Sequence, residues 1–162
     1  MIYNTPKDLI EVGKYNKLEV LRQASVGLYL GDEDGEDVLL PNKYCSENMN
    51  LGEIIDVFVY RDSSDKKVAT TLIPKIFLNE FALLQVTAVS DVGAFLDWGL
   101  EKDLMVPFRE QRQKLVEKRW YVFYLDLDTK TDRLFASNKI EKFLHNELIS
   151  VKEGEEVGLL VL

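Results

Sequence analysis

The chain has very few of the residues on which disulfide-bonded and zinc-bound folds depend. Its 162 residues include one cysteine, Cys45, and one histidine, His145. A single cysteine excludes an intrachain disulfide, and one cysteine with one histidine cannot supply the ligand set of a usual structural zinc site. We therefore expect both residues to be structural, and we expect the chain to bind no metal and no other cofactor.

Long apolar runs are missing as well. No segment approaches the roughly 18 to 20 apolar residues that a membrane-spanning helix needs. The opening residues, MIYNTPKDLIEVG, lack the basic-then-apolar order of a signal peptide. With 46% hydrophobic and 30% charged residues, the composition is that of an ordinary globular chain of one or two domains. We predict a cytoplasmic protein with no membrane partner.

Basic residues are in the minority, since the net charge is −8 and the isoelectric point is near 4.8. Affinity for nucleic acids comes largely from lysine and arginine, so this balance argues against a general phosphate-binding surface. The charge is unevenly distributed, however. Residues 13–72 contain 7 basic and 11 acidic side chains, whereas residues 81–144 contain 10 of each. The second half of the chain should therefore repel phosphate less than the first half.

The densest group of cations lies in FREQRQKLVEKRW, residues 108–120, which holds five basic and two acidic side chains. Two interpretations are open. The segment is either a solvated helix face, with an i,i+4 pair between Glu110 and Lys114, or a phosphate-binding patch to which Arg109 and Arg112 belong.

What the chain does contain is an internal repeat. Three pairs of identical residues lie 66 positions apart: Val20 and Val86, Gly27 and Gly93, and Pro41 and Pro107. A period of this length exceeds that of most solenoid repeats, so each copy is expected to be a small domain. Each copy offers about five short β-branched or aromatic runs separated by turn residues, a pattern typical of a small all-β barrel.

We therefore predict a mainly all-β fold of two tandem five-stranded barrels with short helical connections. The expected parts are an N-terminal segment 1–12, a first domain 13–72, a linker 73–80, a second domain 81–144 and a terminal segment 145–162. The short linker contains Pro74, which indicates two barrels packed close together. Ile140, Phe143 and Leu144 stand at helical spacing and predict one short helix that closes the second barrel.

One aromatic residue in each copy interrupts an otherwise apolar strand, Phe95 in DVGAFLDWG and Tyr29 in SVGLYLGD. Alternate side chains of a strand face opposite sides, so both rings are expected on the outer face. The expected inward set is apolar: Val92, Ala94, Leu96 and Trp98 in one copy, and Val26, Leu28 and Leu30 in the other. A base can stack on such an exposed ring. The alternatives are that the ring packs on the neighbouring barrel, or that a glycine bulge reverses the parity.

The segments VTAVSDVGAFLDWGLEKDLMVPF and YVFYLDLDTKTDRLFAS resemble the S1 RNA-binding domain, an OB-fold. The tandem copies and the phrases GAFLDWGLEKDL and VPFREQ are similar, more narrowly, to the bacterial conserved virulence factor B family of S1-like proteins. This resemblance covers residues 9–162. It implies binding of single-stranded RNA, or alternatively DNA, and a role in post-transcriptional or virulence-related gene regulation.

In that family a third S1-like domain and a winged-helix domain follow. The resemblance therefore implies a truncated chain, in which EGEEVGLLVL, from Glu153 to Leu162, is the opening strand of the third domain. The alternative is a terminal strand that completes some other sheet.

Binding residues of the S1 family are carried over only where this sequence matches them. The aromatic of the second strand corresponds to Phe95 and, less closely, to Tyr29. The remaining matches are the aspartate of the fourth strand, at Asp128 and Asp62, and the basic residue after it, at Arg133 and Lys67.

Two positions depart from the S1 pattern. The aromatic that often precedes the glycine is Val92 in one copy and Val26 in the other, and the third-strand histidine falls on Val106 or Pro107. None of these side chains can stack on a base or donate a hydrogen bond to one. We therefore expect weak RNA binding by either copy alone.

No arrangement of residues indicates catalysis. The sequence shows no nucleophile in a recognisable turn, no glycine-rich phosphate loop and no obvious partner for His145. Asp126 and Asp128 form the nearest carboxylate pair, but aspartates after a strand are ordinary turn formers. We expect no enzyme. The alternative function is a protein-interaction scaffold in which the acidic first barrel docks a partner protein and the exposed aromatics belong to that interface.

Overall fold

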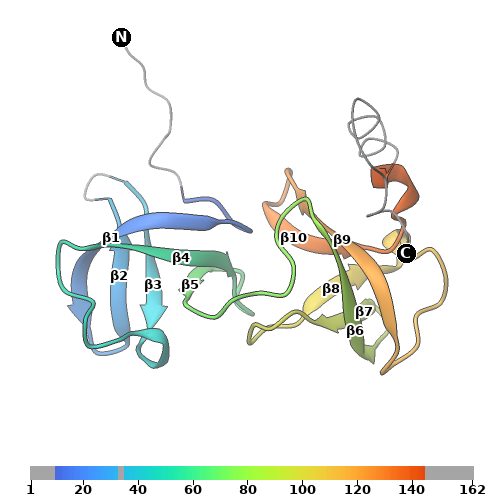
Figure 1. The fold of residues 1–162 in the computed structure, drawn as a ribbon, viewed down its shortest axis with the longest axis horizontal. Helices are drawn as coiled ribbons and strands as arrows, with labels where there is room; N and C mark the ends of the chain where they lie inside the picture. Colours follow the sequence, from blue (N-terminus) through green and yellow to red (C-terminus); the bar gives the residue numbers. More distant parts are fainter. Residues whose placement is uncertain (1–9, 33–34, 145–162) are drawn as a thin grey trace, which may run out of the picture. The chain divides into compact units, whose positions relative to one another are not determined.

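Two sets of five strands follow one another along the chain, and each set forms its own sheet (Figure 1). The structure, a computed structural model, describes residues 10–32 and 35–144. The chain divides into one unit of residues 1–74 with 129–134 and a second unit of residues 75–128 with 135–162. The predicted mainly all-β class with tandem five-stranded folds is confirmed.

The first sheet closes into a barrel with the strand order β1-β2-β3-β5-β4. Its strands are β1 (Tyr15–Ala24), β2 (Gly27–Gly31), β3 (Asp37–Pro41), β4 (Ile54–Arg61) and β5 (Lys67–Thr70). All paired strands are antiparallel except β3 and β5, which are parallel. The barrel closes around fully buried side chains such as Leu30, Leu40, Val57 and Val59.

The second sheet has the order β10-β9-β6-β7-β8. Its strands are β6 (Phe81–Val89), β7 (Gly93–Asp97), β8 (Leu104–Pro107), β9 (Trp120–Asp128) and β10 (Arg133–Ser137). Its core comes from alternate positions of the strands, with Leu84, Val86, Leu96, Phe123 and Leu125 at 0% exposure. Short 3-10 turns follow the third strand of each copy, at Asn42–Tyr44 and Phe108–Glu110.

A short helical turn follows β10, as the spacing of apolar residues predicts. Residues 141–144 are helical, and Ile140 just before them is buried. The ring of Phe143 stacks on Tyr124 of β9, with ring centroids 3.9 Å apart. The predicted opening strand of a third domain, and His145, lie outside the described residues.

The two copies carry a β-bulge at the same place, in the strand that pairs with the aromatic strand. The register of β1 against β2 shifts between Val20 and Arg22, and that of β6 against β7 shifts between Val86 and Ala88. The pairing of β2 with β3 and of β7 with β8 continues without a shift. The bulge therefore leaves the parity of the aromatic strands intact.

Gly27 and Gly93 begin these aromatic strands because the third strand approaches them closely. A β-carbon on Gly27 would lie 2.1 Å from the carbonyl oxygen of Leu40, and one on Gly93 would lie 2.5 Å from that of Val106. Either distance is a severe overlap, so only glycine fits. The glycine that recurs 66 residues apart thus reflects one backbone contact that both sheets need.

The expectation that Val26 and Val92 point inward is wrong. Their side chains are 53% and 56% exposed, although strand alternation predicts them inside. Both stand one residue before their strand, in the turn, where strand alternation does not yet apply.

The helix interpretation of residues 108–120 is also wrong. The segment is a 3-10 turn followed by turns and bends up to β9. Glu110 does not pair with Lys114, because its carboxylate is buried against Ser137, the last residue of β10. There it accepts a 2.7 Å hydrogen bond from the Ser137 hydroxyl and forms an ion pair with Lys142 at 3.1 Å.

Candidate nucleic-acid interface

The structure places Tyr29 and Phe95 at matching positions on the outer faces of β2 and β7. Phe95 is half-buried and stands between Ala94 and Leu96, which are both at 0% exposure. Tyr29 is half-buried between the buried Leu28 and Leu30. The alternation has a simple cause, since side chains one residue apart on a strand point to opposite faces. Each ring is therefore accessible from outside its sheet.

The two rings differ in what lies beside them. On β1, Arg22 stands opposite Tyr29, and its guanidinium carbon lies 4.2 Å from the centre of the ring. Asp37 holds that guanidinium with a 3.0 Å ion pair. In the second copy Ala88 stands opposite Phe95. A cation thus covers one face of the tyrosine, a cation–π contact, while the phenylalanine has only a methyl group at the equivalent place.

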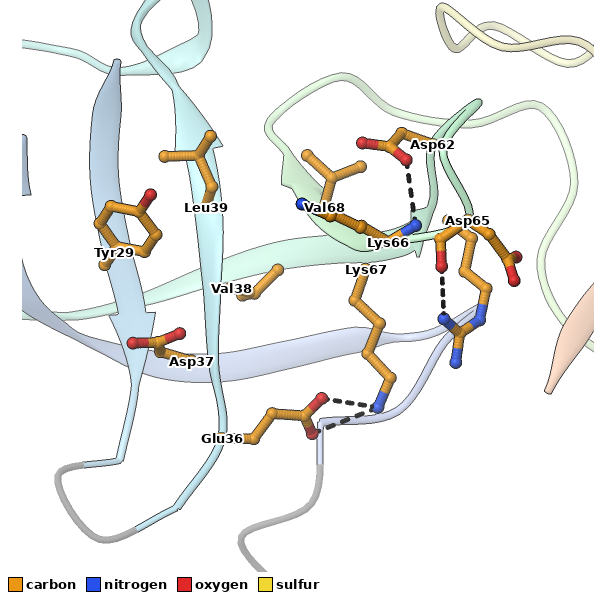
Figure 2. A pocket seen from close by; sticks show the side chains of 11 residues that line it. Tyr29, Glu36, Asp37, Val38, Leu39, Asp62, Asp65, Lys66, Lys67 and Val68 are labelled. Atoms are coloured by element: carbon orange, nitrogen blue, oxygen red, sulfur yellow. Dashed lines mark hydrogen bonds and ion pairs between the residues drawn. The ribbon is translucent and has the colours of Figure 1, made fainter. Parts of the chain in front are cut away.

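A hollow in the first unit lies beside Tyr29, and Figure 2 shows it at close range. Its volume is about 630 Å³, and β2, β3 and the turn between β4 and β5 line it. The charged residues of its lining are four acidic and three basic: Glu36, Asp37, Asp62 and Asp65, with Arg61, Lys66 and Lys67. The lining therefore carries a small excess of negative charge, which does not favour an anionic ligand.

The hollow brings together three predicted site residues, Tyr29, Asp62 and Lys67. The carboxylate of Glu36 holds the Lys67 ammonium at 3.0 Å, as Figure 2 shows, and the ammonium also donates a 2.8 Å hydrogen bond to the carbonyl oxygen of Ile10. Only 15% of the Lys67 side chain is exposed. Its charge is already used to hold two segments of the barrel together.

Asp62 has a structural task in the turn between β4 and β5. Its Oδ1 accepts hydrogen bonds from the backbone N–H groups of Ser64, at 2.8 Å, and Lys66, at 3.0 Å. Aspartate commonly stabilises turns in this way. Asp128 is the last residue of β9 and is half-buried. A role for either carboxylate towards RNA stays a prediction.

Arg133 is more accessible than Lys67. Its side chain is 62% exposed, and its guanidinium makes a 3.0 Å ion pair with Asp65 within the first unit. Surface pairs of this kind contribute at most about 1 kcal/mol, so a phosphate can replace Asp65 at small cost.

Arg109 and Arg112 are also exposed, at 65% and 55% of their side chains. The Arg109 guanidinium lies 5.7 Å from the ring centre of Phe135, and Arg112 forms a 3.1 Å pair with Glu141. Arg109 also lies 3.9 Å from the buried carboxylate of Glu110. Their geometry is compatible with phosphate contacts, and their role stays a prediction.

Two carboxylates have lowered pKa values. At Glu110, burial acts to raise the pKa, but the Ser137 hydrogen bond and the Lys142 ammonium, with Arg109 nearby, outweigh it and hold the pKa below its usual value. At Asp97, two residues beyond Phe95, the hydrogen bond from Lys75 and the backbone N–H of Gly99 lower the pKa. Both acids are therefore ionised at neutral pH with their charge balanced locally.

Sequence reasoning did not find the task of Glu110, because its partners are 27 and 32 residues away in the chain. Within the described ranges, no group of three or more His, Cys, Asp or Glu side chains is arranged to hold a metal ion. In that same part of the chain, no helix has the length and apolar character needed to cross a membrane.

Comparison with known proteins agrees with this geometry. The family model of the S1 domain matches residues 12–72. The uncharacterized protein YitL of Bacillus subtilis is 34% identical over 105 residues, which are 64% of this chain and 35% of YitL. Conserved virulence factor B of Staphylococcus saprophyticus is 26% identical over 133 residues, 81% of this chain and 42% of that protein. The same-named protein of Staphylococcus epidermidis is 30% identical over 101 residues, 61% of this chain and 34% of that protein.

Among solved structures, a multidomain protein with nucleic acid binding domains from Streptococcus pneumoniae matches with a TM-score of 0.68. The two sequences are 20% identical, so the match shows a shared fold, over 83% of this chain and 48% of that one. The chain spans less than half the length of each of these relatives. The predicted resemblance to S1-like proteins and to conserved virulence factor B is confirmed.

Proposed function

We propose that this protein binds single-stranded RNA on the outer faces of its sheets. The proposal starts from the match to the S1 domain and the similarity to conserved virulence factor B. The observation that carries this proposal is the repeated placement of an aromatic ring, Tyr29 on β2 and Phe95 on β7, on the outer face of a five-stranded sheet. Stacking on such rings is how sheets of this type hold unpaired bases.

The second copy is the stronger candidate for RNA contact. Its ring, Phe95, has Ala88 opposite it where Tyr29 has the guanidinium of Arg22. Its residues 81–144 also carry no net charge, while residues 13–72 carry −4. Lower repulsion of phosphate and a less covered ring both favour the same copy.

The acidic hollow of the first unit supports a second candidate function, a protein-interaction scaffold. Its four carboxylates outnumber its three cations, and two of the cations, Arg61 and Lys67, are engaged within the protein. Such a surface suits a basic protein partner better than a phosphate chain. We place the biological role in post-transcriptional or virulence-related gene regulation, as for the resemblance above, with the first copy free to recruit a partner.

A titration of fluorescent oligonucleotides with the intact chain tests the RNA proposal. Fluorescence anisotropy with single-stranded RNA should give saturable binding that weakens as salt rises, because phosphate contacts release counterions. Single-stranded DNA of the same base sequence shows whether the ribose hydroxyl is read. A folded protein that binds neither strand at low salt would refute RNA binding and leave the scaffold.

A further inference from the structure

The start of β9 presents an exposed tryptophan directly after two exposed cations. Trp120 is 52% exposed, and Lys118 and Arg119 before it are exposed as well. Trp120 pairs with Gln85 of β6, and Leu83, two residues earlier on β6, is 59% exposed. Side chains at such diagonal positions on neighbouring strands lie within reach of each other. Trp120 and Leu83 therefore form an apolar platform with positive charge at one edge. The platform lies on the paired strands β6 and β9, whose backbones Figure 1 shows.

The first copy shows which residues the fold itself requires at this place. There Gly52 N–H donates to the Val20 carbonyl, and Val20 N–H donates to the Glu53 carbonyl, both at 2.9 Å. The second copy makes the same two bonds, from Lys118 to Val86 at 2.7 Å and from Val86 to Arg119 at 3.0 Å. The three consecutive residues at this place are therefore equivalent in the two copies: Gly52, Glu53 and Ile54 in the first, Lys118, Arg119 and Trp120 in the second.

The backbone at the first of these positions favours glycine. Gly52 has φ 88° and Lys118 has φ 72°, both in the left-handed region where a β-carbon is unfavourable. A glycine satisfies the same hydrogen bonds in the first barrel, so the fold does not call for a lysine. Its positive charge is what the second copy gains.

The neighbouring cross-strand pair also differs between the copies, and it is charged in the first and apolar in the second. In the first copy Lys17 and Asp56 face each other across β1 and β4 as a 3.2 Å ion pair. The equivalent pair in the second copy is Leu83 and Val122. In the first copy the exposed Ile54 is therefore bordered by an ion pair and by the acid Glu53. In the second copy Trp120 is bordered by two apolar residues and by the cations Lys118 and Arg119. Aromatic rings bordered by lysine and arginine are the recognition chemistry of single-stranded nucleic acids.

We propose that Lys118, Arg119 and Trp120 form a second contact site for the same nucleic-acid strand, with a base stacked on Trp120 and phosphates held by the two cations. This inference rests on the proposed RNA function and extends it beyond Phe95. Among the residues that the structure describes, Lys118 and Arg119 are both exposed and form no ion pair. The nearest acid in the chain, Glu117, turns its carboxylate to the backbone N–H of Val89.

A single strand can reach both rings along one surface. Gln85 pairs with Trp120 on one side and with Asp97 on the other, and Phe95 lies two residues before Asp97. Strands lie about 4.8 Å apart and rise about 3.3 Å per residue, so the path is roughly 10 Å across and 7 Å along the sheet. Asp97 stands opposite Gln85 on this path, and Lys75 balances its charge with an ion pair at 2.9 Å. Asp103 lies beside the path, where its carboxylate accepts a 2.8 Å hydrogen bond from the Thr87 hydroxyl.

The sharpest test installs the first copy's residues in the intact chain, as Lys118→Gly, Arg119→Glu and Trp120→Ile together. The fold should persist, because the first barrel carries these residues at the same backbone positions. Binding sites on such barrels span about 4 to 16 nucleotides, so the probe is a single-stranded RNA of about 20. We expect affinity to fall by about 5- to 150-fold from the lost stacking, and the salt slope to fall by about 1.4 from two lost phosphate contacts.

Phe95→Ala is the matched control that separates this site from the proposed function. If the triple variant binds as tightly as the parent while Phe95→Ala loses affinity, the second site is refuted and RNA binding stands. If the parent chain binds no RNA, both the proposed RNA function and the second contact site are refuted.

Tryptophan fluorescence gives a readout that does not depend on the triple variant folding. The chain has two tryptophans, and Trp98 is 3% exposed with its indole N–H bonded to the Lys102 carbonyl at 2.6 Å. A base stacked on Trp120 should quench the exposed tryptophan as RNA saturates the protein, and Trp120→Phe should bind RNA with the quenching lost. Saturation by RNA without any change of tryptophan emission would refute the stacking.

Discussion

Replacement of Phe95 by alanine separates a ring that binds RNA from a ring that only packs. The side chain stands on the outer face of β7, between Ala88 of β6 and Met105 of β8, and it is half-buried. A fully buried phenylalanine cut to alanine typically costs about 3 to 5 kcal/mol of unfolding free energy. A half-buried ring on an outer face should cost about half of that or less, because less apolar area leaves water on folding. Phe95→Ala should therefore stay folded.

Phe95→Ala should weaken RNA binding measurably even though the protein stays folded. Removal of one stacking ring lowers affinity for single-stranded nucleic acids by about 1 to 3 kcal/mol, or roughly 5- to 150-fold in Kd. Anisotropy with a labelled RNA measures the loss, and urea unfolding of the same preparation measures stability. Tyr29→Ala is the matched variant, and it should lose less, because Arg22 already covers one face of that ring.

One combination of results would overturn this interpretation. If Phe95→Ala leaves RNA affinity unchanged and lowers the melting temperature sharply, the ring is a packing residue. Leu96→Ala is the reference for that outcome, since Leu96 is at 0% exposure and its truncation should cost about 2 to 5 kcal/mol of stability.

Three further predictions concern single residues. Arg133→Ala should lower RNA affinity and reduce the log–log salt slope by about 0.7, with little change in stability, since its ion pair with Asp65 is exposed; an unchanged slope would exclude a phosphate contact. Gly93→Ala should destabilise the protein strongly in urea unfolding, because its β-carbon would lie 2.5 Å from the Val106 carbonyl oxygen, and near-parental stability would contradict that contact. Glu110→Gln should cost about 1 to 3 kcal/mol at pH 7, since it weakens a buried charge-assisted network. The folded-state pKa of Glu110 is lowered, so its contribution to stability is present above the unfolded pKa of about 4.3 and is lost as pH falls through the folded pKa. The stability lost in the variant should therefore shrink in acid. A loss of stability that does not depend on pH would argue against an ionised Glu110.

The two copies show how one backbone can carry two different surfaces. Positions that the barrel needs are kept, such as Gly27 and Gly93 against the third strand. Positions on the outer face differ, such as Arg22 over Tyr29 in one copy and Ala88 beside Phe95 in the other. Because outer side chains contribute little to the core, they can change charge and chemistry without loss of the fold. This separation supports a division of tasks between the copies.

Much of the fold could be predicted from the sequence because it depends on local rules. Alternation of apolar residues along β7 places Ala94 and Leu96 inside and Phe95 outside. The repeat of 66 residues assigns the same architecture to both halves, since a backbone contact that one barrel requires recurs in the other. The all-β class and the outward aromatic rings therefore followed from sequence alone.

The partners of the charged side chains were decided by the tertiary structure, because folding brings together residues that are far apart in the chain. The ion pair of Lys67 with Glu36 crosses 31 residues, and the hydrogen bond of Ser137 to Glu110 crosses 27. No local pattern indicates such partners, so a lysine that matched a binding position proved to be engaged within the barrel. The left-handed backbone of Lys118 is likewise set by its bonds to β6, and only the comparison with Gly52 in the folded repeat shows that its charge is not a requirement of the fold.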